Sequence, residues 1–484
     1  MSYKPPRGAR RLLSKTPMPL RLAASLLLLT TFVAPLSAQA RTSPADSTLV
    51  HSLMKELVAI RSVSGTRETV RAAEAIVARL RSAGFSATDA FVTGSVDSIG
   101  NVVVRLRGKS QSVKPLLLMA HLDVVPALRE DWNTDPFELT ERDGWWYGRG
   151  TGDNKAGVVT IIANMIRWKR AGWVPDRDVV AVMTGDEETT SDQIQWFATG
   201  EGRRHIGDPE FALNYDAGGG SIYNGRAAAL GVQTAEKVYV SYNLTVRNPG
   251  GHSSQPRPDN AIYSLAHGLL GIAEYKFPIE ISPTTRLALT RSAAFEVDSI
   301  ATLMRAVARE PMDEAAARRL TIIPRFNSQL RTTCVATRLS GGHADNALPQ
   351  TAQATVNCRM MPGSDTAVVL AALRRAANDT AVHFSEVNVA TLSPPSPLPP
   401  RILGAFESIA TRFWPGVVVI PSMSSGATDG AYVRNAGIPV YGASGIFSAP
   451  GEGRAHGQDE RIEARRLLEG VGFARATIES LSRQ

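Results

Sequence analysis

Cysteine is almost absent from this sequence. The 484 residues include only two, Cys334 and Cys358. Two thiols are too few for the disulfide framework that holds small secreted domains together. Two readings stay open, a single bridge in an oxidising compartment or two small thiols buried on neighbouring strands. The buried thiols are the reading we expect.

Aromatic residues make up only 6% of the chain, and after residue 40 they do not alternate with clustered lysine and arginine. Nucleic-acid-binding proteins usually show such a basic stripe, so we predict no nucleic-acid partner. The chain also has no internal repeat and no low-complexity tract apart from the proline-rich segment 393–400. These absences leave an ordinary globular chain, long enough for two domains.

The apolar run 22–36 is too short for a membrane-spanning helix and closes on Ala38-Gln39-Ala40. Six basic residues precede it: Lys4, Arg7, Arg10, Arg11, Lys15 and Arg21. We predict a signal peptide at residues 1–40, cleavage after Ala40, and a periplasmic or secreted mature protein with no membrane association. Losing these six unmatched charges lowers the formal net charge from +8 to +2, so the basic character is mostly a targeting signal.

Hydrophobic periodicity predicts an α/β architecture for residues 41–235. Segments 48–62 and 67–84 are amphipathic, as helices are, whereas 114–123 and 177–188 contain short apolar runs typical of buried strands. Such alternation predicts a mixed sheet between layers of helices. Ligands in these folds gather at the carboxyl ends of strands, which is where the acidic residues of these runs fall.

The pattern changes near residue 236. Alternating β-branched residues at 237–248 are followed by an amphipathic segment at 261–275, and further strand patterns follow at 331–342 and 351–363. We predict an inserted α+β lid or dimerisation domain at 236–392, longer than a minimal four-stranded lid because of extra sequence around 292–325. A proline-rich hinge then returns the chain to the first domain at 393–484, so the catalytic domain is discontinuous.

Five separated motifs each carry a side chain that suits a divalent metal: His121 in MAHLDVVP, Asp153 in GRGTGDNKAG, Glu188 in TGDEETT, Asp216 in NYDAGGG and His456 in AHGQDE. Imidazole and carboxylate suit zinc, and five ligands with one bridging carboxylate give three contacts to each of two metals. A water shared by two cations would be acidified to a hydroxide nucleophile near neutral pH. We predict two zinc ions per subunit, with cobalt or manganese as substitutes.

Two further carboxylates have predicted roles beside these ligands. Glu187 directly precedes Glu188, and adjacent carboxylates in a loop can point one to the metal and the other to its water, so Glu187 is the predicted general base. Asp123 lies two residues after His121, close enough to accept the second imidazole N–H and fix the tautomer.

These motifs together resemble the dinuclear-zinc metallopeptidase and aminoacylase family, which includes carboxypeptidase S, glutamate carboxypeptidase, succinyl-diaminopimelate desuccinylase and peptidase T. The resemblance covers nearly the whole mature chain. It rests on seven motifs in the family's order: AHLDVVP, WYGRGTGDNKAG, TGDEE, GGHSSQP, NALP followed by NCRMMPG, SSGATDGAYV and AHGQDE. Seven motifs in order are far more specific than any one of them.

The resemblance implies a role for each metal ligand. His121 and Glu188 are similar to the terminal ligands on opposite metals, and Asp153 to the bridging carboxylate. His456 and Asp216 resemble the outer ligands that complete the two spheres. The position of Asp216 is often glutamate in the family, and its motif can be aligned in a neighbouring register.

The resemblance also implies substrate contacts. His252 resembles a histidine that stabilises the oxyanion, in many members from the partner subunit. Asn346 and Arg359 are similar to a pair that grips a substrate carboxylate, although Arg359 could instead pair with a neighbouring acid. Three residues match a loop that lines the site: Gly426, Thr428 and Asp429.

Other polar and aromatic residues have structural explanations. We expect hydrogen-bonded structural roles for five histidines: His51, His205, His267, His343 and His383. Solvated or capping roles are expected for Asp186, Asp192 and Glu201. Trp132, Trp145 and Trp146 either line a pocket or pack beneath a loop.

The predicted function is therefore an exported zinc exopeptidase of the carboxypeptidase or dipeptidase type. Its substrates would be small peptides with a free carboxylate, and the protein could form a homodimer. The alternative is an N-acyl-amino-acid hydrolase. A reading from a different class, a catalytically silent binding or scaffold protein, would not require an intact Glu187 or two bound metals.

Overall fold

The computed structural model describes residues 44–483, so the predicted signal peptide lies outside the described residues. The larger part of the chain is built around a ten-stranded mixed sheet. Its strand order is β1-β2-β6-β3-β7-β17-β9-β8-β18, and β16 pairs with β9. Its strands are β1 (Ala90–Thr93), β2 (Asn101–Leu106), β3 (Leu116–His121), β6 (Val179–Thr184), β7 (Phe211–Asn214), β8 (Gly219–Tyr223), β9 (Arg226–Glu236), β16 (Val418–Ser424), β17 (Val440–Gly442) and β18 (Phe447–Ser448). Neighbours β6, β3, β7 and β17 run parallel.

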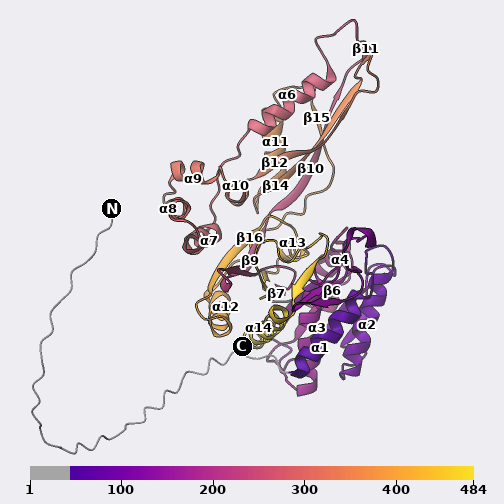
Figure 1. Cartoon of the computed structure of the whole chain (residues 1–484), viewed down its shortest axis with the longest axis vertical. Helices are drawn as coiled ribbons and strands as arrows, with labels where there is room; N and C mark the ends of the chain where they lie inside the picture. The colour runs from indigo at the N-terminus through magenta and orange to yellow at the C-terminus, as the bar shows by residue number, and fades with distance from the viewer. Residues whose placement is uncertain (1–43, 484) are drawn as a thin grey trace, which may run out of the picture. The chain divides into compact units, whose positions relative to one another are not determined.

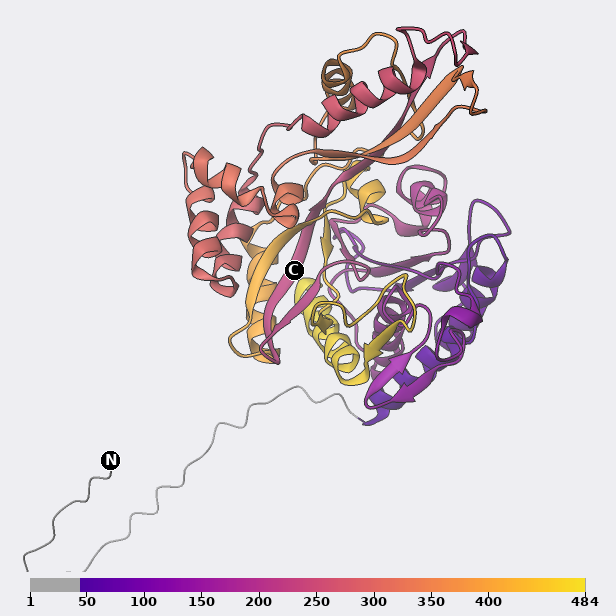
Figure 2. The same ribbon diagram turned by 45° about the horizontal axis from the view of Figure 1, so that its top comes forward.

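Helices cover both faces of this sheet (Figure 1, Figure 2). In β3 every residue is buried, and alternate side chains enter different cores. Leu116 and Leu118 pack with α1 (Pro44–Val58), α3 (Lys155–Ala171) and α14 (Ala464–Leu481), whereas Leu117 and Met119 pack with α4 (Asp192–Thr199) and α13 (Gly430–Asn435). A strand buried on both faces has a continuous apolar sequence, as β3 does. The observed mixed sheet between layers of helices confirms the predicted α/β class.

Further short elements complete this part of the chain. They are α2 (Glu68–Ser82), η1 (Arg129–Asp131), β4 (Thr140–Arg142), β5 (Trp145–Tyr147), α5 (Arg203–Ile206), α12 (Pro400–Phe413) and β19 (Arg461–Glu463). Strands β19, β5 and β4 form a three-stranded antiparallel sheet. Through it, residues more than 300 positions apart lie side by side.

A second, four-stranded antiparallel sheet has the order β12-β14-β10-β15. Its strands are β10 (Val238–Arg247), β12 (Thr333–Gly341), β14 (Thr351–Met360) and β15 (His383–Glu386). Helices α6 (Ala261–Glu274) and α11 (Thr366–Ala377) pack on it around a separate apolar core. All four strands lie within the segment predicted as the inserted domain. The exact boundaries at 236 and 392 stay a prediction.

The extra sequence noted around residues 292–325 belongs to a small helical cluster with its own core. Its elements are α7 (Pro283–Ser292), η2 (Ala293–Phe295), α8 (Asp298–Val307), α9 (Glu314–Leu320) and α10 (Pro324–Leu330). Arg291 ties the cluster to the larger sheet, because its guanidinium donates to the carbonyl of Val419 at 2.5 Å and pairs with Glu407 at 2.7 Å.

The expectation of two free buried thiols is wrong. Cys334 on β12 and Cys358 on β14 are joined in a disulfide. They occupy directly paired positions of the antiparallel ladder, where the Cβ atoms of facing residues lie about 5 Å apart. The strand placement was therefore right, and the bonding state was not. Within residues 44–483, no helix is long and apolar enough to cross a membrane.

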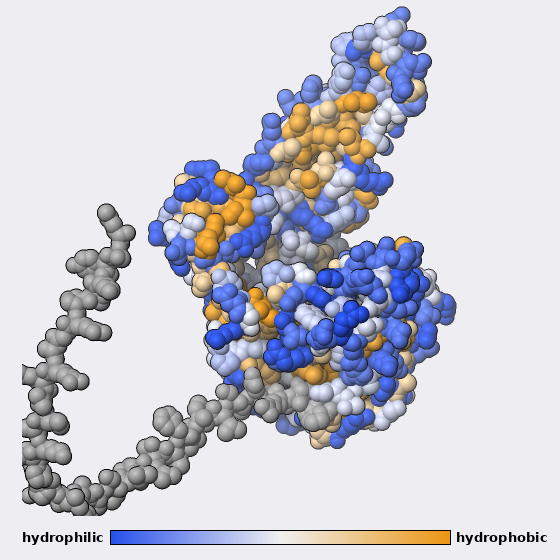
Figure 3. Space-filling model, in the orientation of Figure 1, coloured by the Kyte–Doolittle hydropathy of each residue, from blue (hydrophilic) through white to orange (hydrophobic). Residues whose placement is uncertain are grey.

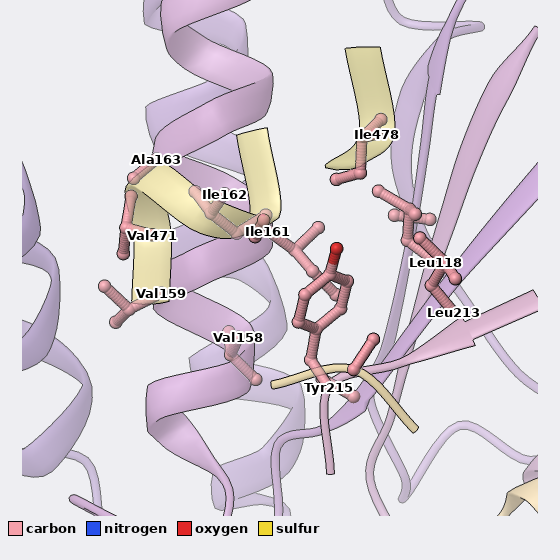
Figure 4. Close-up of a cluster of buried hydrophobic side chains, with 14 of the residues drawn as sticks. Leu118, Val158, Val159, Ile161, Ile162, Ala163, Leu213, Tyr215, Val471 and Ile478 are labelled. Atoms are coloured by element: carbon pink, nitrogen blue, oxygen red, sulfur yellow. The ribbon is translucent and has the colours of Figure 1, made fainter. Parts of the chain in front are cut away.

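Tyr215 is the one polar side chain in the core drawn in Figure 4. Its ring and hydroxyl point among Leu118, Leu213, Ile161 and Ile478, and the hydroxyl has no hydrogen-bond partner among the described residues. Burial raises the pKa of this hydroxyl. A buried hydroxyl without a partner carries an uncompensated desolvation cost.

We expect Tyr215→Phe to raise the free energy of unfolding by about 1 kcal/mol, because it removes the unsatisfied hydroxyl and keeps the ring. Urea unfolding followed by fluorescence and circular dichroism measures this. The matched control is Tyr441→Phe, since the Tyr441 hydroxyl donates to the carbonyl of Pro397 at 2.5 Å. That change should lower stability by a similar amount, and equal destabilisation by both variants would contradict the prediction.

Candidate metal centre

The predicted ligands lie at the carboxyl edge of the larger sheet. His121 is the last residue of β3, and Asp216 follows the adjacent strand β7 by two residues. Glu187 and Glu188 follow β6, on the other side of β3. Parallel strands end at the same edge, so three neighbouring strands bring these side chains together.

Two loops carry the remaining predicted ligands. Asp153 lies in the glycine-rich turn immediately before α3, and its peptide bond to Asn154 is cis. His456 lies in the loop that precedes β19. The structure thus brings together five side chains that span 335 positions of sequence.

The five side chains form two groups that share Asp153. In the first group, His121 Nε2 lies 3.1 Å from Asp153 Oδ1 and 3.4 Å from Asp216 Oδ1. In the second, His456 Nε2 lies 3.2 Å from Asp153 Oδ2 and 2.9 Å from Glu188 Oε1. Each oxygen of Asp153 therefore faces a different histidine, which is the arrangement that a bridging carboxylate requires.

The cluster holds more acidic groups than basic ones, and their pKa values respond to this crowding and to burial. Burial raises the pKa of Glu187 to about 10 and, with Asp153, that of Glu188 to about 7. Burial likewise raises the pKa of Asp216. The hydrogen bonds from His121 and His456 outweigh burial and lower the pKa of Asp153. Four carboxylates face two imidazoles, so a pair of divalent cations would supply the missing positive charge. The donor set of nitrogen and carboxylate oxygen also suits zinc.

Asp123 contacts His121 differently from the prediction. The Nδ1 atom of His121 lies 3.0 Å from the main-chain oxygen of Asp123 and 3.4 Å from its carboxylate. The main-chain oxygen can only accept, so it favours a proton on Nδ1 and directs Nε2 to the cluster. The carboxylate instead accepts the backbone N–H groups of Glu187 at 3.2 Å and Glu188 at 3.0 Å. Asp123 therefore fixes both the imidazole and the acidic loop.

Glu460 is a site residue that the sequence reasoning missed. Its Oε1 accepts the backbone N–H groups of Gly152 and Asp153, at 2.8 and 2.9 Å, and its Oε2 accepts that of Gly150 at 3.0 Å. Arg149 Nη1 donates to the same Oε2 at 2.8 Å, and both charged side chains are buried. Glu460 is the last residue of the AHGQDE motif, and its presence there was the one sequence feature that could have pointed to a role in the site.

The predicted loop residues lie on one turn with different surroundings. Gly426 is exposed, whereas Thr428 and Asp429 are covered. The Thr428 hydroxyl donates to Glu236 at 3.0 Å and accepts from the Asn214 side chain at 3.2 Å. Asp429 accepts from the Thr184 hydroxyl at 2.5 Å, and burial raises its pKa well above the usual value. Asp429 is thus a buried residue beside the cluster, and its side chain is not openly available to a substrate.

The predicted substrate residues do not meet within the chain. His252 in β11 (Gly251–His252) pairs with Ala347 in β13 (Ala347–Leu348), next to Asn346. This ladder continues the pairing of β10 with β14 beyond Thr351, whereas Arg359 lies at the other end of β14. The eight steps of strand from Thr351 to Arg359 span about 26 Å. Asn346 and Arg359 of one chain therefore cannot bind the same carboxylate.

Arg359 also has a neighbour of its own. Its guanidinium lies 4.7 Å from the ring centre of Tyr239, and it makes no ion pair with a carboxylate among residues 44–483. The alternative that Arg359 pairs with a neighbouring acid is therefore not supported.

Several residues with expected structural roles have them. His51 lies 2.7 Å from Glu141, and His205 packs against Trp196. Asp186 accepts from the Thr190 hydroxyl and the backbone N–H of Gln193. Of the three tryptophans, Trp132 and Trp146 are buried, and Trp145 lines a cavity beside the cluster.

Comparisons with known proteins agree with this geometry. The chain is 29% identical over 380 residues to the human N-fatty-acyl-amino acid synthase/hydrolase PM20D1, covering 76% of this chain and 74% of that protein. It is 28% identical over 389 residues to the probable carboxypeptidase S-like 2 of Dictyostelium discoideum, covering 77% and 73%. Its fold matches a metallo-carboxypeptidase from Sulfolobus solfataricus with a TM-score of 0.68 at 17% identity, over 90% of this chain and 99% of that one. Residues 117–480 match the model of peptidase family M20/M25/M40, and the chain belongs to this family of metal-binding amide-bond hydrolases.

Proposed function

We propose that the chain is an exported, zinc-dependent hydrolase that releases amino acids with a free carboxylate from small amide substrates. The observation that carries the proposal is the pair of ligand groups sharing Asp153, with Glu187 beside them. Peptides are the first substrate class, and the similarity to a carboxypeptidase S-like protein supports it. N-acyl amino acids are the second, and the similarity to an N-fatty-acyl-amino acid hydrolase supports them.

We assign His121 and Asp216 to one metal, Glu188 and His456 to the other, and Asp153 to both. When bound, two zinc ions would polarise the scissile carbonyl and acidify the attacking water. His121 keeps its orientation because Asp123 holds Nδ1, and Asp153 keeps its place because Glu460 holds the backbone on both sides of Gly152. Main-chain contacts thus help to position these proposed ligands.

Glu187 is the proposed proton carrier. The raised pKa of Glu187 describes the site without cations, and two bound cations would favour its carboxylate form. In that form it takes the proton of the attacking water and delivers it to the leaving nitrogen. The side chain is 13% exposed, and its Oε2 lies 3.9 Å from His121 Nε2, close to the ligand atoms and outside both ligand groups. The backbone N–H of Glu187 is held by Asp123, which restricts where the carboxylate can go.

A homodimer would complete the substrate site. His252 and Asn346 lie beyond one end of β14 and Arg359 near the other, so in such a dimer a second copy would supply His252 and Asn346 to the site served by Arg359. His252 would then stabilise the oxyanion, while Asn346 and Arg359 hold the substrate carboxylate.

The surface of the four-stranded sheet supports this dimer. Strand β12 is an edge strand nine residues long, and edge strands offer unpaired backbone groups to another chain. On it, Val335 and Leu339 are 60% and 71% exposed, and Leu270 on α6 is 60% exposed. Figure 3 shows hydrophobic residues gathered over this part of the chain.

The function is tested with a substrate panel. The mature protein is incubated, with zinc and after chelation, with dipeptides, their C-terminally blocked forms and N-acyl amino acids, and the released amine is measured by mass spectrometry. We expect metal-dependent release from free-carboxylate substrates only, because the carboxylate is the group that Arg359 holds. Absence of release from every substrate would favour the silent binding-protein reading.

Glu187→Gln should lower turnover at least about 100-fold while leaving the metal content unchanged, because the amide cannot accept the water's proton. Plasma mass spectrometry of the purified protein measures the metal. The matched control is Glu201→Gln at an exposed position, which should retain activity. Wild-type activity of Glu187→Gln would remove the residue from its role.

Mixing two inactive variants tests the shared site. Glu187→Gln and His252→Ala each disable every site of their own homodimer. If His252 acts across the dimer, half of the randomly reassembled dimers contain one intact site, so about a quarter of wild-type activity should return. Activity that stays at the level of the separate variants would mean that His252 acts within its own chain or not at all.

A further inference from the structure

A cavity of about 340 Å³ lies beside the metal centre and has no part in the proposed mechanism. Asp153 and Asp216 form one side of it, so a molecule inside would lie against the ligand cluster. Four apolar side chains also line it, beside several polar and charged ones: Trp145, Ile446, Phe447 and Ile462. The volume is at the small end of the range for ligand sites, which suits a group of a few carbons.

Two arginines line this cavity, and one of them is already neutralised. Arg466 pairs with Glu452 at 2.5 Å and with Glu463 at 2.5 Å. Glu452 also accepts the backbone N–H of Ala449 at 2.7 Å. Glu463 also pairs with Arg465 at 3.3 Å, so the Arg466 guanidinium and both neighbouring carboxylates are already engaged within the protein.

Arg461 differs, because its guanidinium makes no direct ion pair among residues 44–483, although its charge contributes to lowering the pKa of nearby Glu452. Its Nε donates to the main-chain oxygen of Glu452 at 3.2 Å, and Nη1 donates to the Tyr147 hydroxyl at 3.0 Å. A guanidinium has five N–H groups, so three remain, including both on Nη2. The side chain also lies 4.5 Å from the ring centre of Trp145, which fixes its plane.

Backbone pairing also fixes the position of Arg461. Arg461 pairs with Tyr147 in the antiparallel ladder of β19 and β5. The preceding residue, Glu460, anchors the loop that carries Asp153. The guanidinium is therefore fixed relative to the metal ligands, as a specificity residue must be.

We propose that this cavity is a substrate subsite for a short carbon chain ending in a carboxylate, and that Arg461 selects that carboxylate. The proposal rests on the proposed amide hydrolase function and narrows its substrates. The four apolar side chains would hold the methylene groups, and the free N–H groups of Arg461 would bind the terminal oxygens. Two sources of this group are compatible with the cavity, a dicarboxylic acyl group and the acidic side chain of the released amino acid.

Matched substrates distinguish the two sources. N-succinyl-alanine against N-butyryl-alanine tests the acyl side, and N-acetyl-glutamate against N-acetyl-glutamine tests the amino-acid side. We expect the wild-type protein to prefer the carboxylate in one of the pairs by about 10- to 100-fold in kcat/KM, the usual range for a hydrogen-bonded charge. Arg461→Met should remove that preference and change kcat/KM for the uncharged substrate less than about threefold.

Arg412→Met is the control variant, since Arg412 is exposed on α12 and does not line the cavity. It should retain the wild-type preference. No preference in either pair by the wild-type protein, or equal losses on both members of a pair in Arg461→Met, would overturn the subsite.

Binding separates this proposal from the proposed function. If no substrate is hydrolysed, the hydrolase assignment fails, and calorimetry of the zinc-loaded protein with succinate and butyrate decides about the subsite. Succinate should bind at least about tenfold more tightly than butyrate to the wild-type protein and lose this advantage in Arg461→Met. Equal affinities in the wild-type protein would overturn the subsite.

Discussion

Crowding of carboxylates at one edge of the larger sheet is the constraint on which the other features of the site depend. Asp153, Asp216, Glu187 and Glu188 converge there with only two imidazoles to offset them. Burying a charged carboxylate costs free energy of desolvation, and hydrogen bonds or cations must offset that cost. The surrounding chain supplies the first kind of compensation, and the metals of this family supply the second.

The compensation by the chain comes from backbone N–H groups. Asp123 accepts two from the acidic loop, and Glu460 accepts three from the glycine-rich turn. Each of these buried carboxylates joins segments far apart in sequence, 64 and about 310 positions respectively. Distant segments of the chain are therefore tied together by the same bonds that position the predicted ligands.

The sequence predicted the sheet and the ligand cluster because both leave local marks, namely apolar runs for β3 and β6 and short motifs for the ligands. It could not reveal what depends on distance or redox state. Asn346 and Arg359 are 13 positions apart, yet the extended β14 separates them, and no motif records that length. The disulfide depends on strand register, which pairs Cys334 with Cys358. Glu460 carried no mark because an acid that binds backbone looks like any other acid.

Specificity must come from groups outside the ligand cluster, because peptides and N-acyl amino acids present the same amide to it. Glu460 and Arg461, at the start of β19, show how the two tasks can be joined without interfering. Successive side chains along an extended segment point to opposite sides, so Glu460 reaches the turn before Asp153 while Arg461 reaches the neighbouring cavity. A substitution at Arg461 can then change which substrate is held while the anchor of the metal turn stays in place. Adjacent residues of one backbone segment thus serve different tasks, Glu460 positioning the metal turn and Arg461 selecting the substrate.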